Sequence, residues 1–295
     1  MPPAAERSGV AAPCPVCKGP GAVTRRLSAE YRIVRCHACG LEFADPMRSA
    51  GPDWYAACSI YAEAEAGAQL RWEHEQFGRA RLQGRRLLEV GCGRGAFVEL
   101  AASQGYEVHG VDVQTRSLDA ARRRVPRASF DLLDVERESP TGAFDIVTAF
   151  EVVEHLEHPV DVVTRLAGCL VQGGKFVISL PSIERGPFFT RLSAVDFPPH
   201  HLTMWTRRAV IHLLEAAGLT VGDVSAKDFD PGDFRLLLED YFSLTSPLAR
   251  RIAGRVCQGL GPLLRRWPTS GGCTLFAIGA KPWAPAAPAL TASRE

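Results

Sequence analysis

Three glycines alternate with other residues in the stretch Gly91-Cys92-Gly93-Arg94-Gly95. A short apolar run containing one acidic residue, Glu89, precedes them, and a helix-like run over residues 96–103 follows. Glycine lets the backbone turn sharply and approach a ligand where a Cβ would intrude. The N–H groups at the start of a helix point toward such a ligand. The stretch therefore predicts a strand, a tight turn and a helix that together bind a polar ligand.

Asp112 follows about 20 residues after the glycines, at the end of a second strand-like run. A carboxylate there can accept hydrogen bonds from both hydroxyls of a ribose. The pattern Gly91-x-Gly93-x-x-Ala96 also satisfies the relaxed dinucleotide fingerprint. Spacing alone therefore leaves a nicotinamide dinucleotide and S-adenosylmethionine both open as the adenosine cofactor.

Two Cys-x-x-Cys pairs lie near the N-terminus, Cys14 with Cys17 and Cys36 with Cys39. Zn²⁺ binds four thiolates in a tetrahedron, and two such turns brought together by a hairpin supply them. Residues 31–35 alternate like a strand that leads into the second pair. We expect a closed, structural zinc site with these four ligands rather than two unrelated or redox-active pairs.

Three histidines are candidates for a general base, because histidine titrates near neutral pH. His155 follows an apolar strand-like run, and His200 and His201 lie in a long predicted loop over residues 181–203. A structural role is the alternative for each. Neighbouring side chains tend to point apart, so we expect that His200 and His201 cannot both face one acceptor.

The chain has 295 residues, of which 46% are hydrophobic and 23% are charged, and a net charge of +1. This composition is typical of an ordinary globular protein and less basic than that of a nucleic-acid-coating protein. No apolar run is long enough to span a bilayer. Paired and scattered cysteines suit a reducing compartment with a metal site, so we expect a cytoplasmic protein.

From residue 85 onward, strand-like and helix-like runs alternate. The expected strands are 86–90, 107–113, 128–132, 144–150, 175–180, 219–226 and 273–279, and the main expected helices are 96–103, 117–124, 159–170 and 206–217. This order predicts a doubly wound α/β sheet with its ligand at the carboxyl ends of the strands.

The predicted organisation has five parts. They are a disordered segment 1–12, a zinc-binding module 13–48, a helical connector 49–84, a main domain 85–282 with a helical insertion at about 230–270, and a flexible tail 283–295. Aromatic residues in the connector either pack on the domain, which we favour, or wall the active site.

Residues 87–97 resemble motif I of the class I S-adenosylmethionine-dependent methyltransferases, in which an acidic residue precedes Gly-x-Gly-x-Gly. Four further segments resemble, in order, the ribose-binding motif, the adenine-binding segment, the fourth-strand motif and the turn into strand five; they are 110–113, 131–134, 144–156 and 173–176. The resemblance covers about residues 85–226 and the last strand. It implies a seven-stranded, mostly parallel sheet whose last strand runs antiparallel between strands five and six.

The resemblance also decides between the two cofactors. Glu89 suits the ammonium group of S-adenosylmethionine and would be a poor neighbour for a pyrophosphate. It implies Asp134 near the adenine amine and a backbone contact from Leu133. The implied cofactor-binding residues are Glu89, Gly91, Cys92, Gly93, Gly95, Asp112, Val113, Leu133, Asp134, Phe150 and Glu151.

Residues 196–206 resemble a segment in a small-molecule branch of these enzymes, where a four-cysteine module recurs. This implies a small-molecule acceptor: a sugar, a quinone-like ring or a natural-product intermediate. The alternative is ribosomal RNA, because some rRNA methyltransferases carry a similar module. Residues 1–50 show only a mild excess of basic residues and no aromatic-basic RNA-reading motif, so the small molecule is favoured.

Residues 248–267 contain five arginines, no acidic residue, and apolar residues at near-helical spacing. They predict either a helix at a membrane surface or a lid that packs its apolar face on the domain, which we favour. Gly254, Gly259 and Gly261 are expected to weaken a continuous helix.

Overall fold

The computed structural model describes residues 11–51, 54, 70–184, 196–227, 246–264 and 273–283, and the statements below concern these residues. Most of the predicted N-terminal segment and tail, and residues 52, 53 and 55–69 of the predicted connector, lie outside them. So does the helix-like run 234–242 of the predicted insertion.

The main sheet has seven strands in the order β10-β11-β8-β7-β4-β5-β6. The strands are β4 (Arg86–Val90), β5 (Glu107–Asp112), β6 (Ser129–Leu132), β7 (Phe144–Phe150), β8 (Leu170–Pro181), β10 (Thr220–Ala226) and β11 (Thr274–Ala280). β11 pairs antiparallel with both β8 and β10. The other five strands, β8, β7, β4, β5 and β6 in their order across the sheet, pair parallel with one another. The predicted fold class and the position of the last strand are confirmed.

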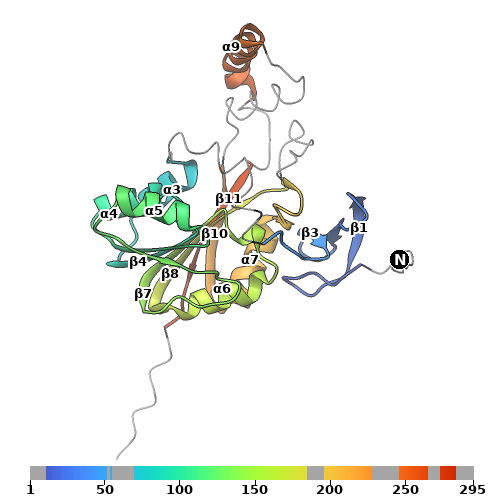
Figure 1. The fold of residues 1–295 in the computed structure, drawn as a ribbon. Coiled ribbons are helices and arrows are strands. Elements are labelled where there is room, and N and C mark those ends of the chain that lie inside the picture. Colours follow the sequence, from blue (N-terminus) through green and yellow to red (C-terminus); the bar gives the residue numbers. More distant parts are fainter. Residues whose placement is uncertain are drawn as a thin grey trace, which may run out of the picture.

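Helices cover both faces of this sheet (Figure 1). One face is covered by α3 (Trp72–Ala80), α4 (Ala96–Ser103) and α5 (Thr115–Arg124), and the other by α6 (Pro159–Gly168) and α7 (Arg207–Ala216). Two buried clusters correspond to the two faces, one containing Phe97 of α4 and the other Leu213 of α7. Thr206, the first residue of the expected helix 206–217, caps α7, because its Oγ1 accepts a hydrogen bond from the N–H of Ala209 at 3.0 Å.

β8 begins earlier than the sequence predicts. Leu170 already pairs with Phe144 of β7, so the Gly173-Gly174 turn expected before the strand lies inside it. The register shifts between Phe144 and Ile146, which absorbs the irregularity at the glycines.

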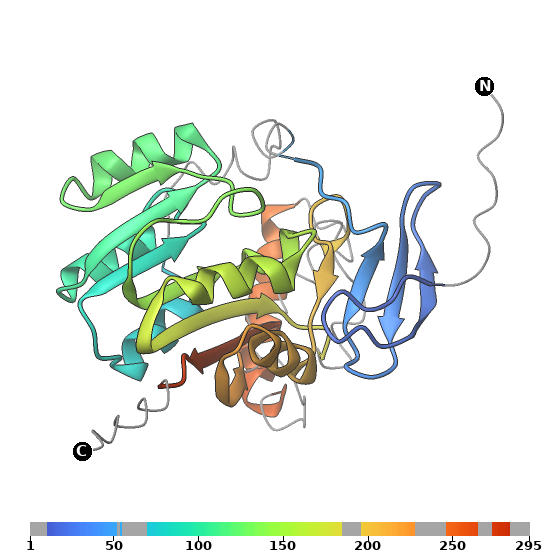
Figure 2. The ribbon, with the colours of Figure 1, turned by 90° about the horizontal axis from the view of Figure 1, so that it is seen from below.

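The N-terminal module forms a second sheet with the order β1-β2-β3-β9. Its first three strands are β1 (Gly21–Arg26), β2 (Arg32–Cys36) and β3 (Glu42–Asp45), whereas β9 (Thr203–Met204) belongs to the loop between β8 and α7. Module residues such as Val34 and Phe43 share one buried cluster with Trp205 and Val210. Figure 2 shows the module at one end of the main domain. The module and the domain are therefore joined by a common sheet and a common core.

Helix α9 (Pro247–Leu264) is continuous, although its glycines were expected to weaken it. Glycine costs only about 1 kcal/mol per helical position, which good helix formers nearby can offset. Leu248, Ile252 and Val256 are 65%, 55% and 49% exposed, and α9 stands away from the sheet in Figure 1. For these three side chains the favoured expectation of a packed lid is wrong. Within the described part of the chain, no helix is long and apolar enough to cross a membrane.

Candidate active site

The glycine turn lies between the end of β4 and the start of α4. Gly91 has φ +71°, and a Cβ there would lie 2.5 Å from Cγ2 of Val152, so only glycine fits. A Cβ built on Gly93 would meet no atom within 4 Å, so this part of the turn faces open space. The turn thus has one crowded side against the loop after β7 and one side open to a ligand.

Asp112 connects this turn to the end of β5. Its carboxylate accepts hydrogen bonds from the N–H of Gly93 at 2.8 Å and from the N–H of Gln114 at 2.9 Å. Burial raises the pKa of this carboxyl, and the backbone N–H groups oppose that rise. A carboxylate offers about four acceptor positions, so the group can still accept from two ribose hydroxyls.

Glu89 places a carboxylate beneath the turn. Its side chain is buried on β4, and Oε2 has no hydrogen-bond partner in the described structure. Burial raises its pKa well above the usual range, while the charge of Arg71 lowers it and that of Asp112 raises it further. A buried acceptor without a donor is costly unless a ligand supplies one. The ammonium group of S-adenosylmethionine fits that requirement in charge and in hydrogen bonding.

Two other predicted cofactor residues turn their side chains into the core. Sγ of Cys92 fills the space next to Gly110, and the ring of Phe150 packs 4.9 Å from that of Phe97. Both side chains are buried. The side chains of Cys92 and Phe150 therefore serve packing, and a contact of either residue with the cofactor stays a prediction.

The predicted adenine-binding segment follows β6. The N–H of Leu133 donates to the carbonyl oxygen of Asp112 at 3.0 Å, so this donor serves to close the loop. Oδ1 of Asp134 accepts from the N–H of Glu136 at 3.0 Å. Asp134 and Val113 are both half-buried and follow neighbouring strands, which places them at the predicted edge of the sheet.

Glu151 begins the loop after β7 in a left-handed conformation with φ +53°. This conformation is uncommon for a residue other than glycine, and such strain concentrates at functional sites. Its Oε1 accepts from the hydroxyl of Ser179 at 3.2 Å, and its N–H donates to the carbonyl of the same residue. The neighbouring strand β8 therefore holds Glu151 at the carboxyl edge of the sheet.

The three candidate histidines lie together. The ring centroid of His155 is 4.8 Å from that of His200 and 4.9 Å from that of His201, and the latter two stack at 4.5 Å. The side chains of His200 and His201 therefore do not point apart, although the expectation that they cannot both face one acceptor stays a prediction. The N–H groups of both donate to the carbonyl of Phe197, so the chain turns here and their side chains do not alternate.

His155 is held by its own hydrogen bond. Its Nδ1 lies 2.7 Å from the carbonyl oxygen of His200, which can only accept, so Nδ1 carries the proton and Nε2 the lone pair. Burial lowers the pKa of His155 to about 4, although this hydrogen bond partly opposes the shift. The ring is therefore neutral at neutral pH.

Two residues that act on the electrostatics of the site, Glu154 and Arg71, were not predicted from the sequence. Glu154 has a fully buried side chain, with Oε1 3.8 Å from Nε2 of His155 and 3.9 Å from Nε2 of His201. Burial raises the pKa of Glu154 well above its usual range, and the charge of Glu151 adds to that rise. Arg71, which precedes α3 and pairs with Glu73 at 2.7 Å, opposes the rise in pKa of both Glu89 and Glu154 by its charge. Glu154 adjoins His155 in sequence and could have been noticed, whereas nothing near Arg71 signals this role.

The connector's aromatic residues divide between the two predicted roles. Phe77 and Trp72 pack on Phe97 and Phe276 in the core. The ring of Trp54 lies 5.7 Å from that of His200, beside the histidine cluster. Tyr55 and Tyr61 lie outside the described residues.

The four predicted metal ligands, Cys14, Cys17, Cys36 and Cys39, come together with their sulfur atoms within 4.8 Å of one another. The Sγ–Sγ distances are 3.7 Å for Cys14–Cys39 and 3.4 Å for Cys17–Cys36. Four thiolates at about 2.3 Å from one Zn²⁺ lie about 3.8 Å apart, so the spacing fits this ion. Each pair is followed by a residue with positive φ, Lys18 or Gly40.

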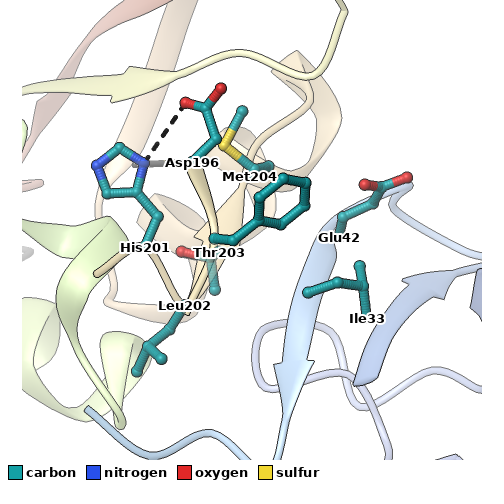
Figure 3. A pocket seen from close by; sticks show the side chains of 8 residues that line it. Ile33, Glu42, Asp196, His201, Leu202, Thr203 and Met204 are labelled. Atoms are coloured by element: carbon teal, nitrogen blue, oxygen red, sulfur yellow. Dashed lines mark ion pairs between the residues drawn. The ribbon is translucent and has the colours of Figure 1, made fainter. Parts of the chain in front are cut away.

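A small pocket lies where the N-terminal module meets the loop that contains His200 and His201 (Figure 3). Ile33 and Glu42 line it from the module, and Asp196, His201 and Met204 line it from the loop. Its volume of about 10 Å³ has room for roughly one water molecule. A larger hollow of about 500 Å³ lies near the amino ends of β4 and β5, away from these residues.

Residues 40–224 match the model of a family described as a methyltransferase domain. The chain belongs to this methyltransferase family. It is 30% identical over 162 residues to a ubiquinone biosynthesis O-methyltransferase from Nitrosococcus oceani, covering 48% of this chain and 69% of that protein. The chain spans only 44% to 57% of the length of several other relatives with the same description.

Solved methyltransferase-related structures share the fold. A chain of a Haloferax volcanii complex containing the Trm112 methyltransferase activator is 19% identical, with a TM-score of 0.54 over 80% of this chain and 99% of that one. A Haemonchus contortus phosphoethanolamine N-methyltransferase in complex with S-adenosyl-L-methionine is 21% identical, with a TM-score of 0.50 over 71% and 52%. The family, together with this fold, makes the chain a class I S-adenosylmethionine-dependent methyltransferase.

Proposed function

We propose that this methyltransferase transfers a methyl group to a hydroxyl oxygen of a small, quinone-like acceptor. The carrying observation is the cofactor cradle, in which Oε2 of the buried Glu89 lacks a hydrogen-bond partner among the described residues and Asp112 accepts a hydrogen bond from the glycine turn. The names of relatives at about 30% identity support an oxygen acceptor on a quinone-like molecule. The histidine cluster, formed by His155 after β7 and by His200 and His201 before β9, supports an acceptor with a proton to lose.

In this proposal each part of the site has a separate task. S-adenosylmethionine, when bound, supplies an electrophilic methyl group on a sulfonium. Glu89 pairs with its ammonium group, and Asp112 accepts from the ribose hydroxyls. Positioning supplies much of the rate enhancement in such in-line transfers. A neutral imidazole such as His155 is in the protonation state needed to accept the hydroxyl proton.

The test is methyl transfer from labelled S-adenosylmethionine to a panel of ortho-hydroxylated quinols, sugars and ribosomal RNA. We expect a mass gain of one methyl on the quinols. Transfer to RNA with a salt-dependent shift would support the alternative acceptor instead. Transfer to none of these, with the cofactor bound, would contradict the proposed acceptor class.

We also propose that Cys14, Cys17, Cys36 and Cys39 hold a structural Zn²⁺. The sulfur spacing and the two equivalent turns support this ion. A four-thiolate site has no open position for chemistry, so its contribution is to folding.

Finally, we propose that α9 contacts an anionic lipid surface. Leu248, Ile252 and Val256 recur every four residues and form one exposed face. Arg250, Arg251 and Arg255 lie among them and are exposed too. An apolar face with basic neighbours is typical of interfacial helices. This contact is compatible with the cytoplasmic location, which stays a prediction.

A further inference from the structure

Four potential metal ligands meet where the loop after β7 contacts the loop before β9. Each of His155, His200 and His201 offers a ring nitrogen, and these three nitrogens lie within 4.8 Å of one another. Ligands at about 2.1 Å from one ion are roughly 3.0–4.2 Å apart, depending on the angle between them. Side-chain shifts of less than about 1 Å would therefore bring the three nitrogens onto a common ion.

The carboxylate of Glu154 completes the set. Its side chain is fully buried, and neither oxygen has a hydrogen-bond partner among the described residues. Its distances of 3.8 and 3.9 Å to Nε2 of His155 and His201 are too long for hydrogen bonds. A buried carboxylate without donors is costly, and a cation between it and the imidazoles would remove that cost.

Other contacts fix these ligands in place. The Nδ1–H of His155 donates to the carbonyl of His200, which aims the Nε2 lone pair of His155 away from that bond. A histidine ligand that donates its second N–H to a carbonyl is a common arrangement around metals. The N–H of Leu202 donates to the carbonyl of Glu154 at 2.8 Å, so the two loops are also joined by backbone.

We propose that His155, His200, His201 and Glu154 bind a divalent transition-metal ion beside the cofactor cradle. Three imidazoles and one carboxylate favour Zn²⁺, Co²⁺ or Fe²⁺ over Mg²⁺ or Ca²⁺, which prefer oxygen ligands. The site is separate from the four cysteines and uses different ligand chemistry.

The ion gives the acceptor a place to bind. This step rests on the proposed function. A cation that accepts the acceptor's oxygen as a further ligand lowers the pKa of that hydroxyl, and its proton passes to solvent. The oxygen lone pair then forms the new O–C bond, and the S–C bonding pair leaves with the sulfur of the cofactor. In the metal-bound state the histidines hold the ion and none of them acts as the base.

Cobalt provides a test that does not depend on activity. The full-length, metal-depleted protein is titrated with Co²⁺ and followed by absorption. Thiolate ligation at the four cysteines gives intense near-ultraviolet bands, whereas histidine and carboxylate ligation gives only weaker visible bands. We expect both sets in the unmodified protein, and loss of the second set alone in His155→Asn and His200→Asn.

Glu154→Gln is the second variant, because it removes the charge with little change in shape. We expect Co²⁺ affinity at the histidine site to fall at least about tenfold, with circular dichroism and binding of S-adenosylhomocysteine retained. His158→Asn is the matched control, since this histidine lies three residues along the same loop and is 65% exposed. It should leave both sets of bands unchanged.

Equal metal content and identical spectra for the unmodified protein and all three site variants would overturn the metal site. Metal binding without methyl transfer to any acceptor would instead contradict the proposed function and leave the metal site standing. Transfer that survives full metal depletion would remove the proposed role in activating the acceptor.

Discussion

At the scale of single residues, the site combines several groups that are energetically unfavourable without a partner. Glu89 and Glu154 are buried carboxylates with oxygens that lack partners in the described structure. Glu151 has a strained backbone held by Ser179. Such features cost stability, and the two proposals account for them by placing positively charged groups beside Glu89 and Glu154.

Asp112→Ala should weaken S-adenosylmethionine binding by about a hundredfold or more. The variant loses two ribose hydrogen bonds to a charged group, each of about 1.5–3 kcal/mol, and it also releases the N–H of Gly93 from its partner. Calorimetric titration measures the affinity. The control variant Asp119→Ala, which removes a half-exposed carboxylate on α5, should bind the cofactor normally. Equal affinities of the two variants would contradict the ribose contact.

Glu89→Gln should stabilise the cofactor-free protein at neutral pH and weaken cofactor binding. The folded-state pKa of Glu89 is raised by burial, so the group favours folding below its unfolded pKa of about 4.3. That contribution is lost as the pH rises through the folded-state value. Removing it should gain about 1–3 kcal/mol at neutral pH, or roughly 3–10 °C in Tm.

Thermal unfolding from pH 5 to 8 measures this effect. The stability difference between Glu89→Gln and the unmodified protein should grow with pH and vanish near pH 4. A difference that stays constant with pH would show that the carboxyl is not buried in the unliganded protein.

At the scale of elements, most helices and strands follow from local patterns, but α9 has an unexpected environment. Its three described large apolar residues project outward, and arginines accompany them. A helix of this type is stable only with a partner for its apolar face.

Leu248→Glu with Ile252→Glu should abolish binding to anionic phospholipid vesicles, measured by co-sedimentation. The unmodified protein should bind these vesicles and bind neutral phosphatidylcholine vesicles more weakly, because the arginines add attraction to anionic lipid. Leu70→Glu is the control, since Leu70 is similarly exposed at 54% outside α9. No vesicle binding by the unmodified protein would rule out the proposed contact.

At the scale of the whole molecule, the cysteine module supports the acceptor side of the site. β3 pairs with β9, and Ala44 donates its N–H to the carbonyl of Leu202 at 2.8 Å. Thr206, the cap of α7, also donates its hydroxyl to the carbonyl of Cys39 at 2.5 Å. These contacts attach residues 202–206, which directly follow His200 and His201, to the module.

Cys39→Ser should therefore loosen the histidine loop as well as the module. We expect faster hydrogen exchange at residues 200–206, with β4 and β5 remaining protected because their pairing does not involve the module. Exchange mass spectrometry with and without added Zn²⁺ measures this. Faster exchange confined to residues 13–45 would show that the module folds independently.

The cofactor side of this protein could be predicted from its sequence because its determinants are local. Glu89, the three glycines and Asp112 lie on consecutive elements, where the order of strand, turn and helix already dictates their arrangement. The two cysteine pairs likewise carry their geometry within four-residue turns. The sequence did not predict which side chains near the cradle pack in the core. Cys92 and Phe150 lie next to cradle residues in the sequence, yet their side chains point into the core.

The acceptor side was decided by tertiary structure. Glu154 and His155 meet His200 and His201 across more than forty residues, and only the pairing of β7 with β8 brings their loops together. The turn at Phe197 places two adjacent histidines on one side, and the module's β3 holds the strand that follows them. The glycine stretch by itself predicted an adenosine cofactor, because backbone geometry there is local, and Glu89 with the resemblance to motif I narrowed the prediction to S-adenosylmethionine. What faces that cofactor depends on contacts between distant segments, which no local pattern encodes.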